Sequence, residues 1–336
     1  MSRALAFAAL AAQIVFTITW LVAASWQGPA YSVIAHSISE HTDLIDAAGA
    51  ADLISKQGFL LLFRTEARRD AAFADADGDA RDYGVGRAKL DAGELARLEP
   101  ALRLTGVGAL HWTDPWTVRD PGALVDAYVT LFKQLGGTFA IGDARTLRAA
   151  GSGWTVDITN GAESAAEVVL ALGPWATEAT RKLGYRLPLF VKRGYHREYA
   201  EAPGVALNRP VLDIETGFLL APMRRGIRLT TGAEFADLDA PKNESQINGT
   251  ETIARQVLEF GERRDTDPWM GARPCTPDMM PIIGKAPRHE GLWFAFGHAH
   301  HGLTLGPVTG RVLAELITGD APFIDISAYR PERFAP

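Results

Sequence analysis

The chain has 336 residues, of which 47% are hydrophobic and 22% charged, and its formal net charge is −6. This length suffices for a large buried core, and the composition is that of an ordinary globular protein. An acidic chain without a block of Lys and Arg argues against nucleic acid as a partner, because phosphates require clustered positive charge. A single cysteine, Cys275, excludes an intramolecular disulfide framework and a cysteine-rich metal site.

Residues 4–25 are almost wholly apolar, with Arg3 before them and Ala23-Ala24-Ser25 at their end. A membrane anchor needs about 20 apolar residues, and this run just reaches that length. A signal peptide needs a charged start, an apolar centre and small residues at its exit. We expect instead a buried helix of the folded protein, and we keep the anchor and the signal peptide as alternatives.

The first half of the chain carries several local signals. Apolar residues recur at helical spacing over Tyr31–Ala51, which predicts a helix. Phe59–Phe63 is apolar throughout, as a strand buried on both faces is. Helices are also predicted over Glu66–Ala76 and over Asp91–Leu98, the latter ending before Pro100.

Asp120-Pro121 has the pattern of a helix start, with Asp as N-cap and Pro in the first turn. The helix is expected to run over 123–134 and to end at Gly136-Gly137, followed by a strand over Thr138–Ile141. Residues 154–159 then alternate in polarity, turn at Asn160-Gly161 and return toward Glu167–Leu172, which predicts a hairpin.

Between residues 185 and 265, short alternating segments predict an antiparallel sheet, with one helix over Thr250–Phe260. The sheet segments are His196–Tyr199, Gly217–Pro222 and Ile227–Thr231.

Two later segments combine strands with glycines. Val168–Gly173 is an apolar strand that ends in glycine before Pro174-Trp175, and ligands of doubly wound sheets lie beyond such strand ends. Leu292–Phe296 is a second apolar strand that breaks at Gly297 and enters a helix near Gly302. A buried strand that ends in glycine without binding anything is the alternative for both.

The glycines of that last helix, Gly302, Gly306 and Gly310, recur every four residues and share one face. Such a face permits close approach to a sheet or a ligand, and the free N–H groups at Gly302-Leu303-Thr304 favour negative charge. The alternative is tight helix–sheet packing without a ligand.

Arg273 lies in a Pro-rich segment, W-x-G-x-R-P-x-T-P-D, which runs from Trp269 to Asp278. A guanidinium binds a carboxylate through two parallel hydrogen bonds, which fixes its orientation. The alternative is an arginine bound to Asp278 or to loop carbonyls.

These motifs together, W-x-G-x-R-P-x-T-P-D-x-x-P-x-I-G and G-H-x-x-x-G-x-x-L-x-P-x-T-G, resemble the D-amino-acid oxidase and dehydrogenase family of FAD enzymes. The resemblance extends from about residue 50 to the end of the chain. It implies an α/β fold of two lobes (α+β): an incomplete doubly wound FAD-binding lobe and an antiparallel-sheet substrate lobe. The expected division is an apolar helical region at 1–50, the incomplete FAD-binding lobe, with some strands of the substrate lobe, at 51–184 and 266–336, and the antiparallel-sheet substrate lobe at 185–265.

The resemblance also implies site residues. The substrate-binding residues are expected to be Arg273, His298 and His300, with no catalytic group beyond the flavin. Cofactor-binding residues, for non-covalent FAD, are expected at Gly173, Pro174, Trp175, Gly297, His298, Gly302, Leu303 and Thr304. No metal is expected.

The sequence departs from the family in three places. It has no G-x-G-x-x-G, the unit that binds the FAD pyrophosphate. His300 stands where glycine oxidases have a second arginine, and Leu219 where family oxidases often have tyrosine. Cys275 is not at the position of the flavin-linking cysteine of sarcosine oxidases, so we expect a small buried side chain.

The expected reaction is oxidation of a D-amino acid, or of a proline-type imino acid, by hydride transfer to flavin N5. A quinone or the respiratory chain is the expected electron acceptor, and the expected location is the cytoplasm or the inner face of the cytoplasmic membrane. The competing hypotheses are a truncated, FAD-free remnant or binding module, and a separate chain that supplies the missing unit.

Overall fold

The computed structural model describes residues 17–18 and 29–334. The apolar run 4–25 therefore lies outside the described residues, except for β1 (Thr17–Ile18), which pairs with Trp116 and Thr117. Within the described ranges, no helix is both long enough and apolar enough to cross a membrane.

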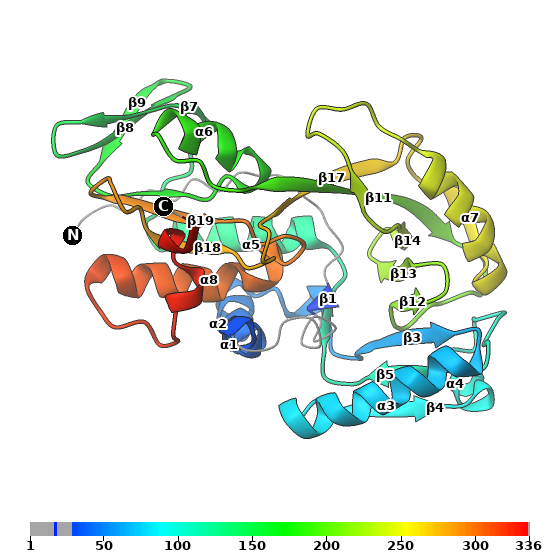
Figure 1. Ribbon diagram of the computed structural model, residues 1–336. Helices are drawn as coiled ribbons and strands as arrows, with labels where there is room; N and C mark the ends of the chain where they lie inside the picture. Colours follow the sequence, from blue (N-terminus) through cyan, green and yellow to red (C-terminus); the bar gives the residue numbers. More distant parts are fainter. Residues whose placement is uncertain (1–16, 19–28, 335–336) are drawn as a thin grey trace.

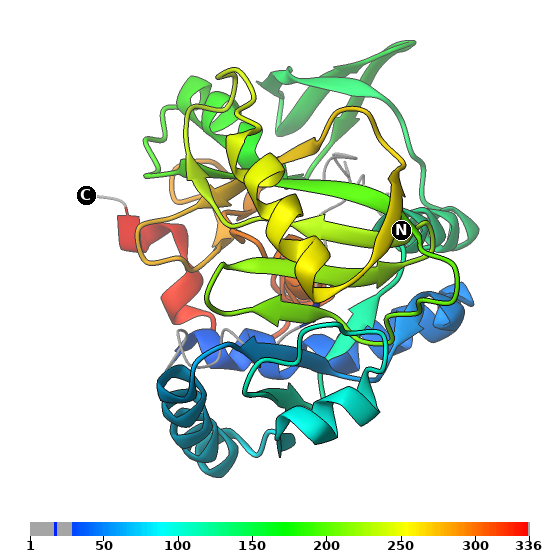
Figure 2. The ribbon, with the colours of Figure 1, turned by 90° about the vertical axis from the view of Figure 1, so that its right-hand side faces the viewer.

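A ten-stranded sheet is the largest element of the fold (Figures 1 and 2). Its order is β15-β11-β14-β13-β12-β3-β5-β4, and β16 and β17 also pair with β11. Only the β12–β3 pair is parallel. The strands are β3 (Phe59–Phe63), β4 (Arg87–Leu90), β5 (Gly108–Trp112), β11 (Phe190–Glu201), β12 (Val211–Asp213), β13 (Phe218–Met223), β14 (Gly226–Thr230), β15 (Glu234–Phe235), β16 (Phe260–Arg263) and β17 (Trp269–Cys275).

Helices cover parts of both faces of this sheet. Leu60 and Leu62 of β3 pack in the same core as α4 (Ala92–Leu98) and α7 (Ser245–Val257). Phe59 and the other odd-numbered residues of β3 face α3 (Glu66–Tyr83), which lies along β3 and β5 (Figure 1). Every residue of β3 is buried because helices cover both its faces, as its unbroken apolar sequence predicted.

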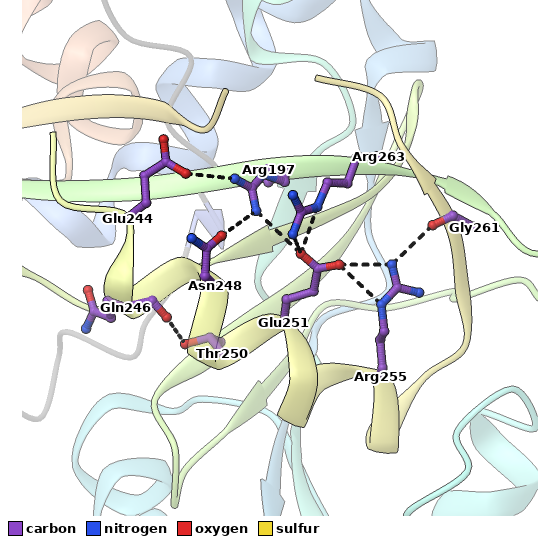
Figure 3. Close-up of polar contacts among 9 residues, drawn as sticks. All are labelled: Arg197, Glu244, Gln246, Asn248, Thr250, Glu251, Arg255, Gly261 and Arg263. Carbon is purple, nitrogen blue, oxygen red and sulfur yellow. Dashed lines mark hydrogen bonds and ion pairs between the residues drawn. The ribbon is translucent and has the colours of Figure 1, made fainter. Parts of the chain in front are cut away.

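A network of charged groups fixes α7 to the sheet (Figure 3). Arg197 of β11 is 1% exposed and reaches Glu244 at 3.2 Å, Asn248 at 3.0 Å and Glu251 at 3.4 Å. Glu251 also accepts a 2.7 Å hydrogen bond from Arg263. Since side chains alternate along a strand, the odd-numbered residues of β11 serve this helix and the even-numbered residues face the other way.

The second part of the fold is built on a three-stranded sheet, β10-β19-β18, in which β10 (Val168–Leu170) is parallel to β19 (Leu292–Phe296). One face packs on α8 (Gly302–Thr318), next to α1 (Pro29–Ala35) and α2 (Ser37–Ala48), and the other packs near α6 (Ala176–Lys182). The remaining elements are β2 (Ile54–Ser55), β6 (Trp116–Val118), β18 (Ile282–Lys285), α5 (Pro121–Gln134), the hairpin strands β7 (Gly142–Ala150), β8 (Gly153–Ile158) and β9 (Gly161–Ala165), and the short 3-10 turns η2 (Ala51–Leu53), η3 (Gly173–Trp175), η4 (Ser327–Tyr329) and η5 (Pro331–Phe334).

Several expected elements are confirmed. The helix over Tyr31–Ala51 is present as α1 and α2, broken at His36. Asp120 caps α5 by accepting a 3.0 Å hydrogen bond from the Ala123 N–H, and Asp91 caps α4. The antiparallel sheet segments are β11, β13 and β14.

Four expected boundaries are wrong. Thr138–Ile141 is not a strand, because the chain after α5 enters the antiparallel β7 only at Gly142. The strand that returns from β8 is Gly161–Ala165, whereas Val168–Leu170 leaves the hairpin to pair with β19. The third helix does not end at Ala76 but continues to Tyr83, where Gly84 with φ 68° ends it.

The helix expected over Thr250–Phe260 is the fourth error. It lies instead at Ser245–Val257, because Ile247, Ala254 and Val257 form its buried face, and Phe260 begins β16.

Candidate active site

Two paired glycines leave a strip of bare backbone on the face of the sheet that carries the even-numbered residues of β11. Gly194 of β11 lies opposite Gly271 of β17. A Cβ atom at Gly194 would lie 2.7 Å from Cζ of Arg273, and one at Gly271 would overlap the ring of Trp269. Arg273 and Trp269 therefore occupy the space that the two glycines leave, and the sheet carries a guanidinium and an indole side by side.

Arg273 forms no ion pair with a carboxylate among the described residues. Burial of the guanidinium lowers its pKa. The alternative pairing with Asp278 is wrong, since Asp278 binds Arg333 at 2.9 Å. A largely buried cation without a counter-ion is costly, and an anionic ligand would remove that cost.

The turn between β19 and α8 lies against Arg273. The Ala299 N–H donates a 2.9 Å hydrogen bond to the Pro274 carbonyl, and Gly297 and Ala299 both have positive φ, at 82° and 51°. His300 lies close enough to Arg273 for that charge, together with burial, to lower its pKa to about 4. The structure thus brings Arg273, His300 and the start of α8 together, as the motifs predicted.

Helix α8 begins at Gly302, as expected. A histidine of another helix donates a hydrogen bond to a carbonyl in the first turn of α8. Pro307 has no N–H, so the carbonyl of Leu303 lacks its partner in the helix. His41 of α2 supplies that hydrogen bond through Nε2 at 3.0 Å, and its Nδ1 lies 2.8 Å from the Tyr128 hydroxyl of α5. His41 is fully buried, which lowers its pKa and keeps it neutral.

The glycine face of α8 points away from the sheet. Gly302, Gly306 and Gly310 are exposed, whereas Leu305 and Val308 face the sheet core. The expected alternative of tight helix–sheet packing through these glycines is therefore wrong. They line an apolar groove of about 590 Å³, together with Glu40, Asp43, Leu44, Tyr128, Leu303, Pro307, Arg311 and Ala314.

The other residues predicted for the site lie in η3 and in the turn before α8. Gly173, Pro174 and Trp175 form η3 directly after β10, and η3 contacts β17. Trp175 is 44% exposed. His298 is buried, with Nε2 3.0 Å from the Thr309 hydroxyl of α8, and its pKa is lowered to about 4 by burial. Its ring therefore holds the turn against the helix.

The sequence interpretation missed the buried polar groups on the even-numbered face of β11. His196 is 4% exposed and stacks on Trp269 with ring centroids 4.7 Å apart. Burial lowers its pKa to about 2, with smaller effects from Arg228 and Arg225. Only the strand register, which aligns His196 with Trp269, could have revealed this pair.

Glu198 and Arg228 form a buried ion pair one step further along the same face. Among the buried polar atoms that have no hydrogen-bond partner within the described part of the chain are Arg228 Nη1, Thr230 Oγ1 and Thr304 Oγ1. Orphaned polar atoms are rare in folded proteins and indicate places where a ligand or water binds.

Comparison with known proteins places these features in a family. Residues 11–316 match the family described as FAD dependent oxidoreductase. A D-amino-acid oxidase of Bradyrhizobium diazoefficiens is 28% identical over 303 residues, covering 88% of this chain and 70% of that protein. A D-amino acid dehydrogenase of Cereibacter sphaeroides is 34% identical over 307 residues, covering 88% and 68%.

Solved structures share the fold. Glycine oxidase from Geobacillus kaustophilus superposes with a TM-score of 0.79 at 22% identity, over 90% of this chain and 83% of that one. Iminodiacetate oxidase from Chelativorans sp. BNC1 gives 0.75 at 22% identity, over 90% and 84%.

Proposed function

The chain belongs to the FAD-dependent oxidoreductase family, and we propose from this that it oxidises a D-amino acid, or a proline-type imino acid, by hydride transfer to flavin N5. The single observation that carries the substrate class is the unpaired guanidinium of Arg273, beside the two paired glycines and the start of α8. The names of the relatives, D-amino-acid oxidase and D-amino acid dehydrogenase, support the same class.

The residues at the start of α8 fit the ring end of FAD. Thr304 carries a buried hydroxyl without a partner there, and Gly302 leaves open space beside the helix. Gly173, Pro174 and Trp175 and the turn from Gly297 to Thr304, with His298, would hold the group, and α8 would direct its positive end at the ring. Bound FAD supplies the hydride acceptor.

Binding would be non-covalent, because Cys275 is fully buried and its Sγ lies 3.5 Å from the Arg273 carbonyl. The sequence offers no G-x-G-x-x-G for the pyrophosphate, so no residue is assigned to that part of the cofactor.

Catalysis in this site would depend on orientation. Arg273 would bind the substrate carboxylate through two parallel hydrogen bonds and so fix the direction of the Cα–H bond. The pKa of His300, lowered to about 4, keeps its ring neutral near pH 7, so it adds no positive charge that would repel an amine. A substrate that binds with its amine neutral then needs no side-chain base.

The test of the carboxylate role is Arg273→Ala, with Arg273→Lys as the conservative control. We expect KM to rise about 10²-fold in Arg273→Ala, because a charge-assisted hydrogen bond contributes roughly 1.5–3 kcal/mol. Arg273→Lys should recover part of the loss, because it keeps the charge and loses the bidentate geometry. An unchanged KM in Arg273→Ala would refute the proposed role.

The competing function is a protein that binds its ligand without flavin, and the lack of G-x-G-x-x-G favours it. Purified protein should be yellow, and added FAD should raise its Tm, since a ligand of the native state stabilises that state. A colourless protein with an unchanged Tm would support the FAD-free function. If FAD binds only after a second polypeptide is co-purified, the missing unit is supplied by another chain.

For the electron acceptor we propose a quinone or the respiratory chain, with the enzyme in the cytoplasm or at the inner face of the cytoplasmic membrane. The dehydrogenase relatives support an acceptor other than oxygen. Reduction of a quinone analogue without oxygen consumption is the expected result, and rapid oxygen consumption would contradict it.

A further inference from the structure

A second cation lies beside Arg273. Lys192 of β11 is the direct cross-strand neighbour of Arg273, so both side chains leave the same face of the sheet. Within the described residues, the ammonium of Lys192 forms no ion pair with a carboxylate. The ammonium contacts the Met279 sulfur at 3.8 Å and the rings of Phe235 and Phe190, whose centroids lie 5.4 and 5.7 Å away.

Arg273 and Lys192 both lie close enough to His300 to affect its pKa. Positive charge on Arg273 and on Lys192 lowers the pKa of His300, in addition to the larger effect of burial. Two nearby carboxylates are already engaged: Glu234 accepts hydrogen bonds from Arg193 and Tyr195, and Asp278 binds Arg333. The site therefore holds one cation more than a single α-carboxylate requires.

The position of Lys192 indicates where a second carboxylate of a ligand would lie. The ring of Phe235 is 73% exposed, so Lys192 lies at the rim of the site, whereas the Arg273 guanidinium lies over Gly194. The aromatic faces hold the ammonium by cation–π attraction without neutralising it. A side-chain carboxylate that points toward the rim would complete the ion pair.

We propose that Lys192 selects substrates with a second carboxylate, so that the preferred substrates are acidic amino acids such as D-glutamate and D-aspartate. This inference rests on the proposed function for the oxidation itself, and the binding of a diacid tests it separately. A tenfold preference corresponds to about 1.4 kcal/mol, which is within the range of a partly desolvated ion pair.

The first measurement is calorimetric binding of two unreactive ligands of equal shape, glutarate and its monoamide. We expect glutarate to bind about 10-fold more tightly, and we expect Lys192→Met to remove this difference because it keeps the length and loses the charge. Lys192→Arg should retain the preference. Lys285→Met is the matched control, because Lys285 lies on β18, where it binds Glu290.

The second measurement compares kcat/KM for D-glutamate and D-glutamine in the same variants. Equal binding of glutarate and its monoamide, or a preference that survives Lys192→Met, would overturn the inference. If neutral D-amino acids are oxidised without preference for acidic ones, the inference fails and the proposed function stands. If the diacid preference depends on Lys192 but no D-amino acid is oxidised, the inference stands and the proposed function fails.

Discussion

Gly194→Ala tests the geometry of the site more sharply than removal of a charged group. Gly194 lies in an extended strand without a positive φ, so alanine fits its backbone. The new Cβ would lie 2.7 Å from Cζ and 3.0 Å from Nη1 of Arg273. Contacts between such atoms are favourable only at about 3.5–4.0 Å, so the guanidinium must move by roughly 1 Å.

A displacement of this size in a substrate-positioning group costs about 10²-fold in rate. We therefore expect kcat/KM for the preferred D-amino acid to fall about 10²-fold, mainly through KM, while the stability stays within about 1 kcal/mol of wild type. Steady-state kinetics and urea denaturation of the same preparation measure both quantities.

The control is Gly249→Ala, the same chemical change in α7, where nothing lies within 4 Å of the new Cβ. It should leave kcat/KM unchanged. A Gly194→Ala enzyme with wild-type KM would show that Arg273 does not bind the substrate from its present position.

Three further predictions concern the buried polar groups. Glu198→Ala leaves the buried Arg228 without its partner and should lower the free energy of unfolding by about 3–5 kcal/mol in urea; a loss below about 1 kcal/mol would contradict this. His298 has a folded pKa of about 4, below its ordinary 6.5, so the unfolded chain binds the extra proton between these values. Its contribution, up to about 3 kcal/mol, is complete above pH 6.5 and is lost as the pH falls toward 4. His298→Gln should make that part of the profile of stability against pH less steep, while the other buried histidines, such as His300, keep a remaining slope. His41→Leu removes the donor to the Leu303 carbonyl and should cost about 1–3 kcal/mol, measured by thermal unfolding at pH 8, where the histidine is neutral in both states.

Local patterns predicted the elements whose causes are local. The unbroken apolar run Phe59–Phe63 is itself the signal of a strand buried on both faces, and Asp120-Pro121 starts α5 through its own cap. The boundaries of α7 failed because its limits depend on a buried face against the sheet and on the pairing of β16 with β11. Neither can be read from the helix segment alone.

The candidate site was predictable in part. The resemblance identified Arg273 and the glycine turn, and the structure brings them together through the bond between Ala299 and Pro274. His196 and Lys192 were beyond reach, because their roles depend on which residues of β17 lie opposite them. The partner of the Leu303 carbonyl lies 262 residues away in the chain, so no local pattern could identify it.

Strand β11 performs two tasks with alternate residues, and this limits how the protein can evolve. Inserting or deleting one residue before Lys192 would exchange the two sets, so that Arg193 and Arg197 would lie on the face that carries Arg273, and their acidic partners on the other face would lose them. Such a change would cost activity and folding at once. Relatives of this protein should therefore vary in length outside β11, for example in the stretch 202–210 that follows it, while within β11 they differ only by substitution.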